Sequence, residues 1–143
     1  MDYDVVVVPE ATYAVTRRTI GFSDVPQVMP GLMEKVLGWA ATVPHGAVMC
    51  VSSVTPEGLL NIGPGVEVDA GAVEPPDGFE LVTRPAGRAV VHLHVGAYEA
   101  LPDVYRKLYD TMTRDGLEEA GEPIEIYETH GPVPETRIFW PVS

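Results

Sequence analysis

The chain has 143 residues, and its 21 Asp and Glu against 9 Lys and Arg give a formal net charge of −12. This length fits one domain of ordinary size. Because neutralising phosphates requires clustered Lys and Arg, we do not expect this acidic chain to bind nucleic acid or an anionic membrane directly. It fits a cationic partner, or an acidic surface that keeps a small protein soluble.

No apolar stretch approaches the ~20 residues of a membrane-spanning helix. The N-terminus also lacks the basic start of a signal peptide. We therefore expect a cytoplasmic protein.

The first half is predicted to contain strands around one helix. Strands are expected where β-branched or alternating apolar residues run: 4–8, 13–20, 47–54, 66–69 and 79–83. Apolar residues three and four positions apart over 25–42 predict a helix, which Pro30 is expected to delay or kink. The stretch 55–65, which ends in Gly63-Pro64-Gly65, is rich in turn residues and is interpreted as a turn.

The second half repeats this order. Strands are expected over 88–95, 124–127 and 136–142. A second amphipathic helix is predicted from the stripe Val104, Leu108 and Met112, with Gly116 at its C-terminal end. Its helical stripe matches that of the first helix.

When the two halves are aligned, Phe22 falls on Tyr98 and the prolines at the two helix starts coincide. A duplicated β-α-β-β unit explains this match. We predict one domain, 1–143, of α+β class, with repeat one over about 1–75 and repeat two over about 76–143. It would have pseudo-two-fold symmetry, an antiparallel sheet with helices on one side, and a ligand groove between the repeats.

Several motifs of the second half occur in the order and spacing of a known family: His94-Val95-Gly96-Ala97-Tyr98-Glu99-Ala100-Leu101, Gly121-Glu122-Pro123, Glu125-Ile126-Tyr127 and Thr136-Arg137-Ile138-Phe139-Trp140-Pro141-Val142. Through them the chain resembles the GyrI-like small-molecule-binding family. This family includes effector-binding domains of multidrug-sensing transcription regulators and stand-alone proteins. The resemblance implies a duplicated domain with a ligand cavity between the repeats, lined by aromatic rings and an acidic residue.

The resemblance also implies site residues. Glu125 corresponds to a pocket carboxylate that meets cationic drugs, Phe139 to a ring facing the same cavity, and Tyr98 to the aromatic residue after the glycine. Arg137 departs from the family, which usually has Glu there; a guanidinium can pair with Glu125, so an anionic or polar ligand stays open. The expected ligand-binding residues are Glu125, Phe139, Arg137, Tyr98, Tyr127, His94, Phe22 and Trp140.

Without the resemblance, purely structural roles for these residues stay open. Alternation places Glu125 and Tyr127 on one face of their strand, and by itself favours a solvated glutamate on an edge strand. Trp140 fits a core position as well as a stacking platform. Cys50 lies in an apolar run and is expected to be a buried structural thiol. His92 and His94 share a strand face, but no third ligand follows, so neither a metal nor a cofactor is expected.

We predict a stand-alone binding protein that captures an amphipathic aromatic small molecule, such as a drug or xenobiotic. No helix-turn-helix segment precedes the first strand, so direct DNA binding is not expected. One alternative is a hydrolase of reactive cyclopropane-type natural products, as some stand-alone relatives are, with Glu125, Tyr98 and Tyr127 as catalytic residues. The other is an interaction module that inhibits a protein partner, as the name-giving member does with DNA gyrase.

Overall fold

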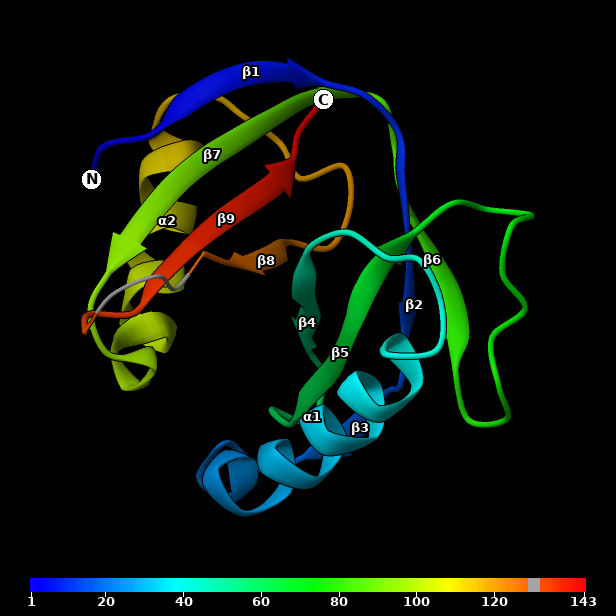
Figure 1. Ribbon diagram of the computed structural model, residues 1–143. Coiled ribbons are helices and arrows are strands. Elements are labelled where there is room, and N and C mark those ends of the chain that lie inside the picture. Colours follow the sequence, from blue (N-terminus) through cyan, green and yellow to red (C-terminus); the bar gives the residue numbers. More distant parts are fainter. Residues whose placement is uncertain (129–131) are drawn as a thin grey trace. The chain divides into compact units, whose positions relative to one another are not determined.

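The computed structural model describes residues 1–128 and 132–143 (Figure 1). The chain divides into two units. Unit 1 consists of Met1–Glu10 and Pro85–Ser143, and unit 2 of Ala11–Arg84. Each unit combines an antiparallel sheet with one α-helix, which confirms the predicted α+β class. Among the described residues, no helix is both long enough and apolar enough to cross a membrane.

Unit 1 carries α2 (Leu101–Arg114) on one face of its sheet (Figure 1). The strands, in spatial order, are β1 (Asp4–Val8), β7 (Gly87–Val95), β9 (Glu135–Pro141) and β8 (Ile124–Tyr127). A short 3-10 helix, η2 (Tyr98–Ala100), leads into α2. The predicted stripe Val104, Leu108 and Met112 is confirmed as the buried face of α2, where it packs on Ile138 and Trp140.

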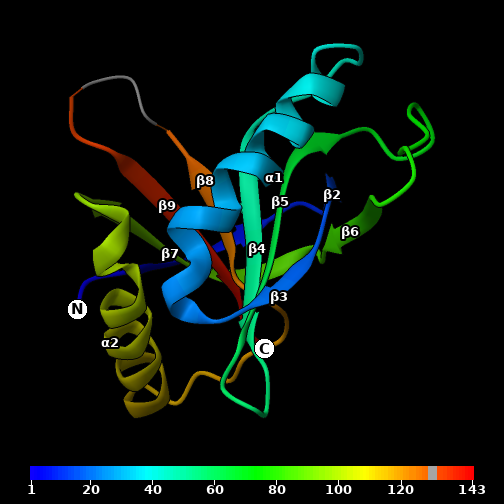
Figure 2. The ribbon, with the colours of Figure 1, turned by 90° about the horizontal axis from the view of Figure 1, so that it is seen from below.

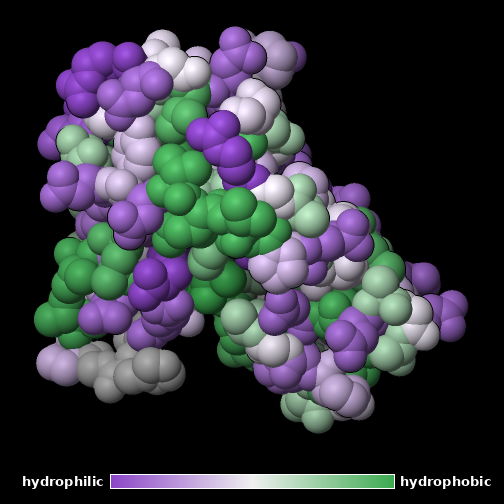
Figure 3. Space-filling model, turned by 90° about the horizontal axis from the view of Figure 1, so that it is seen from above, coloured by the Kyte–Doolittle hydropathy of each residue, from purple (hydrophilic) through white to green (hydrophobic). Residues whose placement is uncertain are grey.

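β1 is an edge strand of unit 1, since its one described strand partner is β7. Val5, Val6 and Val7 are 41%, 39% and 80% exposed. Figure 3, which views the molecule from the side on which β1 lies in Figure 1, shows hydrophobic surface among polar residues. The strand ends at Val8, as the following Pro9 predicts.

Unit 2 carries α1 (Val25–Ala40), which packs on β5 (Figure 2). The strands, in spatial order, are β6 (Glu80–Arg84), β2 (Ala11–Val15), β5 (Leu60–Val68) and β4 (Val48–Val54), and β3 (Arg18–Ile20) pairs with the start of β5. A 3-10 helix, η1 (Phe22–Asp24), precedes α1. α1 begins at Val25, so Pro30 does not delay it. Pro30 removes one backbone hydrogen bond from the helix, but the burial of Leu32 and Val36 on the apolar face offsets that loss.

The Gly63-Pro64-Gly65 sequence lies inside β5, so the turn predicted there is wrong. Gly65 stands opposite Met49 on β4 and Val15 on β2. A Cβ atom on Gly65 would lie 2.0 Å from the carbonyl oxygen of Ala14. The glycine is needed for the close approach of β2, a long-range contact that local turn preferences do not contain.

The two units have the same strand order. The orders are β1-β7-β9-β8 and β6-β2-β5-β4, in which β7 corresponds to β2, while the short β3, which lies between β2 and α1 in the chain, pairs with β5 and has no counterpart in unit 1. The edge strands are exchanged along the chain, because β1 directly precedes β2 and β6 directly precedes β7. A duplicated β-α-β-β unit predicts this equivalence; the duplication and its boundaries, 1–75 and 76–143, stay predictions.

Candidate functional site

Glu125 on β8 is the one acidic residue among the buried side chains of the described residues, with 7% of it exposed. It stands opposite Ile138 on β9. Ile138 belongs to the core cluster beneath α2, and directly opposed residues of an antiparallel pair share a face. Glu125 therefore projects toward the helix-covered face of unit 1, so a solvated edge-strand glutamate is excluded.

Two tyrosines hold the Glu125 carboxyl group. The hydroxyl of Tyr105 on α2 donates to Oε2 at 2.8 Å, and the hydroxyl of Tyr127 on β8 donates to Oε1 at 3.0 Å. Burial raises the pKa of Glu125 above its ordinary value, while the two hydroxyls and the nearby His94 oppose that shift. A carboxylate offers about four acceptor positions, so two remain for another donor.

Aromatic rings continue from this carboxyl group to the surface. Tyr98 packs edge-on against Tyr127, with 5.8 Å between ring centroids. On the other side, Tyr105 packs edge-on against Trp140 at 5.7 Å, and Tyr109 packs against Trp140 at 6.0 Å. Tyr98 and Tyr109 are each 45% exposed. A series of ring contacts therefore connects these exposed tyrosines to the residues that hold the buried carboxyl group, a setting suited to an aromatic or cationic group.

Trp140 is part of the unit 1 core and is 6% exposed. Its indole Nε1 donates to Oε1 of Glu119 at 3.1 Å. Trp140 therefore both fills the core and contacts the tyrosine rings. That it also contacts a ligand stays a prediction.

Arg137 does not pair with Glu125, contrary to the sequence-based hypothesis. It stands opposite Ile126, which places it on the other face of the sheet, and it pairs with Glu128 instead. Its Nε lies 2.9 Å from Oε1 of Glu128, and its Nη2 donates to Oε2 at 3.1 Å. These bonds hold the pKa of Arg137 above its ordinary value.

Phe139 stands opposite Ile124, so it too lies on the face away from Glu125. Within unit 1 the structure does not bring Phe139 and Glu125 together. Phe22 belongs to unit 2, where it begins η1 and is 44% exposed. Tyr98 begins η2 in the same way, which is the equivalence that the aligned halves predict.

The two strand histidines are held by backbone carbonyl groups. Nδ1 of His92 lies 2.6 Å from the oxygen of Asp2, and Nε2 of His94 lies 2.9 Å from the oxygen of Ala97. Within the described part of the chain, no three His, Cys, Asp or Glu side chains converge as a metal site. Cys50 is 2% exposed, which confirms the predicted buried thiol.

Sequence reasoning missed two polar residues near Glu125. Helical spacing alone predicts a packing role for Tyr105, yet a buried tyrosine hydroxyl needs a partner, and that need is the signal that points to a carboxylate. Thr136 on β9 stands opposite Tyr127 and is fully buried. No local pattern marks Thr136, because its neighbours are set by the pairing of β8 and β9.

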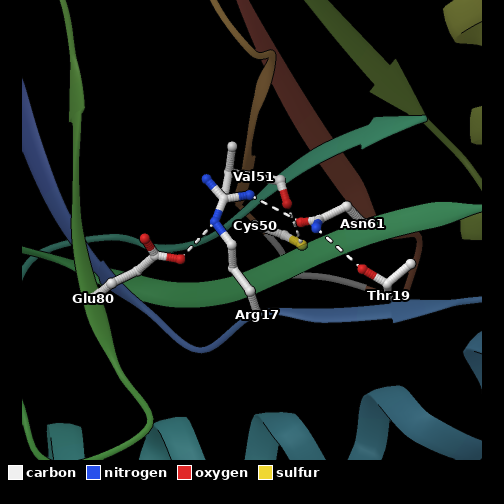
Figure 4. A network of polar contacts seen from close by, with 6 residues as sticks. All are labelled: Arg17, Thr19, Cys50, Val51, Asn61 and Glu80. Carbon is white, nitrogen blue, oxygen red and sulfur yellow. Dashed lines mark hydrogen bonds and ion pairs between the residues drawn. The ribbon is translucent and has the colours of Figure 1, made fainter. Parts of the chain in front are cut away.

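A separate polar network lies in unit 2 (Figure 4). Nη1 of Arg17 donates to Oδ1 of Asn61 at 3.0 Å, and Nε of Arg17 lies 2.8 Å from Oε1 of Glu80. Nδ2 of Asn61 donates to the hydroxyl of Thr19 at 3.2 Å. The three contacts join the β2–β3 connection to β5 and β6, so we assign this network to structure.

The Arg137–Glu128 pair is expected to contribute little stability. Both side chains are about one-third exposed, at 35% and 34%. Exposed ion pairs contribute about 0–1 kcal/mol and are screened by salt. Arg137→Gln should therefore lower the free energy of unfolding, measured by urea denaturation, by less than about 1 kcal/mol. A loss that is larger and independent of salt would contradict this surface role.

Comparison with known proteins identifies the family and the fold. The family model of the GyrI-like small molecule binding domain matches residues 1–143. A search of curated proteins found no match.

Solved structures share the fold across the chain. The C-terminal domain of EcmrR is 20% identical, with a TM-score of 0.72, and the match covers 100% of this chain and 99% of that one. EcmrR in a DNA complex is 18% identical, with a TM-score of 0.74 over 99% of this chain, which spans 57% of that one. At such identities the similarity shows the fold alone.

Two further structures carry chemical information in their own right. SAV2435, solved with bound tetraphenylphosphonium, is 13% identical, with a TM-score of 0.68 over 100% of this chain and 94% of that one. A hydrolase from Listeria innocua is also 13% identical, with a TM-score of 0.63 over 99% of this chain and 92% of that one.

Proposed function

The chain belongs to the GyrI-like small-molecule-binding family, and from this premise we propose that it captures a lipophilic aromatic cation at Glu125. One observation carries the proposal. Glu125 is a buried carboxyl group that is held by two tyrosine hydroxyls, and no described Lys or Arg forms an ion pair with it. A cation supplies the charge partner that the fold leaves out.

The energetics favour such a ligand. An ionised carboxylate in an apolar setting is costly unless a charge or several hydrogen bonds balance it. A bound cation provides that balance, and aromatic rings contribute ~0.5–2 kcal/mol each through cation–π contact. Tyr105 and Tyr127 contact the Glu125 carboxyl group directly, and Tyr98 packs against Tyr127. That SAV2435 binds tetraphenylphosphonium supports this chemical class.

Access requires a movable ring. Tyr98 is 45% exposed and packs against Tyr127, which in turn donates to Glu125. Rotation of Tyr98 away from Tyr127 would remove this ring contact and give the ligand a route toward the carboxylate. Exposed aromatic side chains change rotamer on a fast timescale, so this opening needs no rearrangement of the sheet.

A pair of probes that differ in charge tests the proposal. We expect tetraphenylphosphonium to bind at least about tenfold more tightly than neutral triphenylphosphine oxide, measured by calorimetry or by tryptophan fluorescence. Tryptophan emission is suitable because Trp140 contacts Tyr105. Equal affinity for the two probes would refute the role of charge, and absence of binding by the cation would refute the proposal.

A hydrolase is the second candidate. The structural similarity to the hydrolase from Listeria innocua supports it. Burial raises the pKa of Glu125, which suits this carboxyl group to the role of proton donor or base, and Tyr127 lies in hydrogen-bond contact with it. In this case Tyr98 would polarise the leaving group. Release of product in excess of the protein, lost in Glu125→Gln, would favour hydrolysis over capture.

A further inference from the structure

We propose that the ligand is a cation that carries N–H donors, a protonated amine or an amidinium, and that Thr136 selects it. This inference rests on the proposed cation site at Glu125. Thr136 is fully buried on β9, and its Oγ1 has no hydrogen-bond partner among the described residues. Buried polar groups are nearly always paired, so such a hydroxyl calls for an explanation.

The strand pairing places Thr136 at the carboxyl site. It stands opposite Tyr127 on β8 and opposite His94 on β7, so the three side chains form one row on the α2 face. Directly opposed residues have Cβ atoms about 4.5–5.5 Å apart. Glu125 lies two residues before Tyr127 on the same face and is therefore a diagonal neighbour of Thr136, at about 7–8 Å. One ligand nitrogen can lie about 3 Å from both the Glu125 carboxylate and the Thr136 hydroxyl and so bridge this gap. The two nitrogens of an amidinium can bridge it as well.

The acceptors here exceed the donors. The Glu125 carboxylate keeps about two acceptor positions after Tyr105 and Tyr127 have donated to it. Nε2 of His94 lies against the carbonyl oxygen of Ala97, so this nitrogen is not available to a ligand. Thr136 adds a hydroxyl oxygen with two lone pairs. A ligand with several N–H groups satisfies these acceptors together.

A permanent cation satisfies only part of this arrangement. Tetraphenylphosphonium and quaternary ammonium ions balance the charge of Glu125, but they have no N–H group for Thr136. A buried polar site discriminates strongly against an analogue that lacks the matching hydrogen-bond partner, because the site's own polar atoms are then left unpaired. The chain should therefore bind a protonated amine more tightly than its permethylated analogue.

The test compares 4-phenylbenzylamine, protonated at neutral pH, with its N,N,N-trimethyl derivative and with tetraphenylphosphonium. We expect the wild-type chain to prefer the amine over the trimethyl derivative by about tenfold. Thr136→Val, which replaces the hydroxyl by a methyl group, should remove that preference by weakening the amine alone. Thr111→Val is the matched control, because Thr111 is also buried in unit 1 but donates its hydroxyl to the oxygen of Lys107.

Thermal unfolding gives a second readout. Thr136→Val should unfold at the same temperature as the wild-type chain or higher, since no described partner loses a bond. A clear fall would show that the hydroxyl is needed by the fold, and would overturn the inference. An unchanged preference in Thr136→Val would overturn it as well, while binding of tetraphenylphosphonium would still support the cation site. If neither the amine nor tetraphenylphosphonium binds the wild-type chain, the proposed function itself fails.

Discussion

Glu125→Gln is expected to weaken binding of tetraphenylphosphonium by about tenfold or more, equivalent to ~1.4 kcal/mol or above. The substitution removes the one buried acidic group of the described residues and keeps the shape of the side chain. Tyr105 and Tyr127 still find the amide group as a hydrogen-bond partner, because a tyrosine hydroxyl both donates and accepts. The loss therefore reports charge rather than unfolding, and isothermal titration calorimetry at neutral pH measures it.

Glu128→Gln is the matched control for that substitution. It changes the net charge by the same amount, but Glu128 pairs with Arg137, whose own position is on the sheet face away from Glu125. Its effect on the affinity should be less than twofold, with near-ultraviolet circular dichroism unchanged in both variants. Equal losses in the two variants would mean that the cation senses only overall charge, and would remove Glu125 from the site.

The acidity of Glu125 adds a pH dependence with a definite sign. Burial raises its folded-state pKa above the ordinary value of 4.5. Affinity for a cation should fall as pH drops through that raised pKa, because the protonated carboxyl group carries no charge, and binding should release a proton. Calorimetry in buffers of different ionisation enthalpy detects the proton.

The stability of the fold should depend on the same group. The free energy of unfolding should decrease as pH rises from 4.5 through the folded pKa, because Glu125 loses its proton in the unfolded chain before it does so in the folded one. Glu125→Gln should flatten that slope.

The sequence predicts what local periodicity determines. Val104, Leu108 and Met112 repeat every four residues, so their burial under α2 follows from helical spacing alone. The shared face of Glu125 and Tyr127 follows from strand alternation in the same way, and Tyr127 indeed donates to Glu125.

Contacts between strands could not be predicted in this way. Alternation places Arg137 and Phe139 on one face of β9, but the register of β8 against β9 decides whether that face also carries Glu125. A shift of one residue reverses the answer, and a single sequence does not contain the register. The observed pairing puts Ile138 opposite Glu125 and Thr136 opposite Tyr127, so Thr136 rather than Arg137 shares the sheet face of the carboxyl group.

Gly65→Ala is expected to have the largest effect on stability, a loss of more than about 3 kcal/mol or failure of unit 2 to fold. The new Cβ atom would lie 2.0 Å from the carbonyl oxygen of Ala14 and 2.7 Å from Cγ1 of Val15. Backbone cannot yield as a flexible side chain does, so β2 would have to move away from β5 and give up its pairing. Urea denaturation followed by far-ultraviolet circular dichroism measures the loss.

Gly31→Ala separates this packing effect from the general cost of replacing glycine. Gly31 is an exposed position inside α1, and an added Cβ meets no atom within 4 Å. Alanine restricts the unfolded chain and favours helix, so this variant should gain about 0.5–1 kcal/mol. The β6-β2-β5-β4 order requires that Gly65→Ala lowers the free energy of unfolding while Gly31→Ala raises it. If Gly65→Ala unfolds like the wild-type chain, β2 does not approach β5 at Gly65, and the strand order of unit 2 has to be revised.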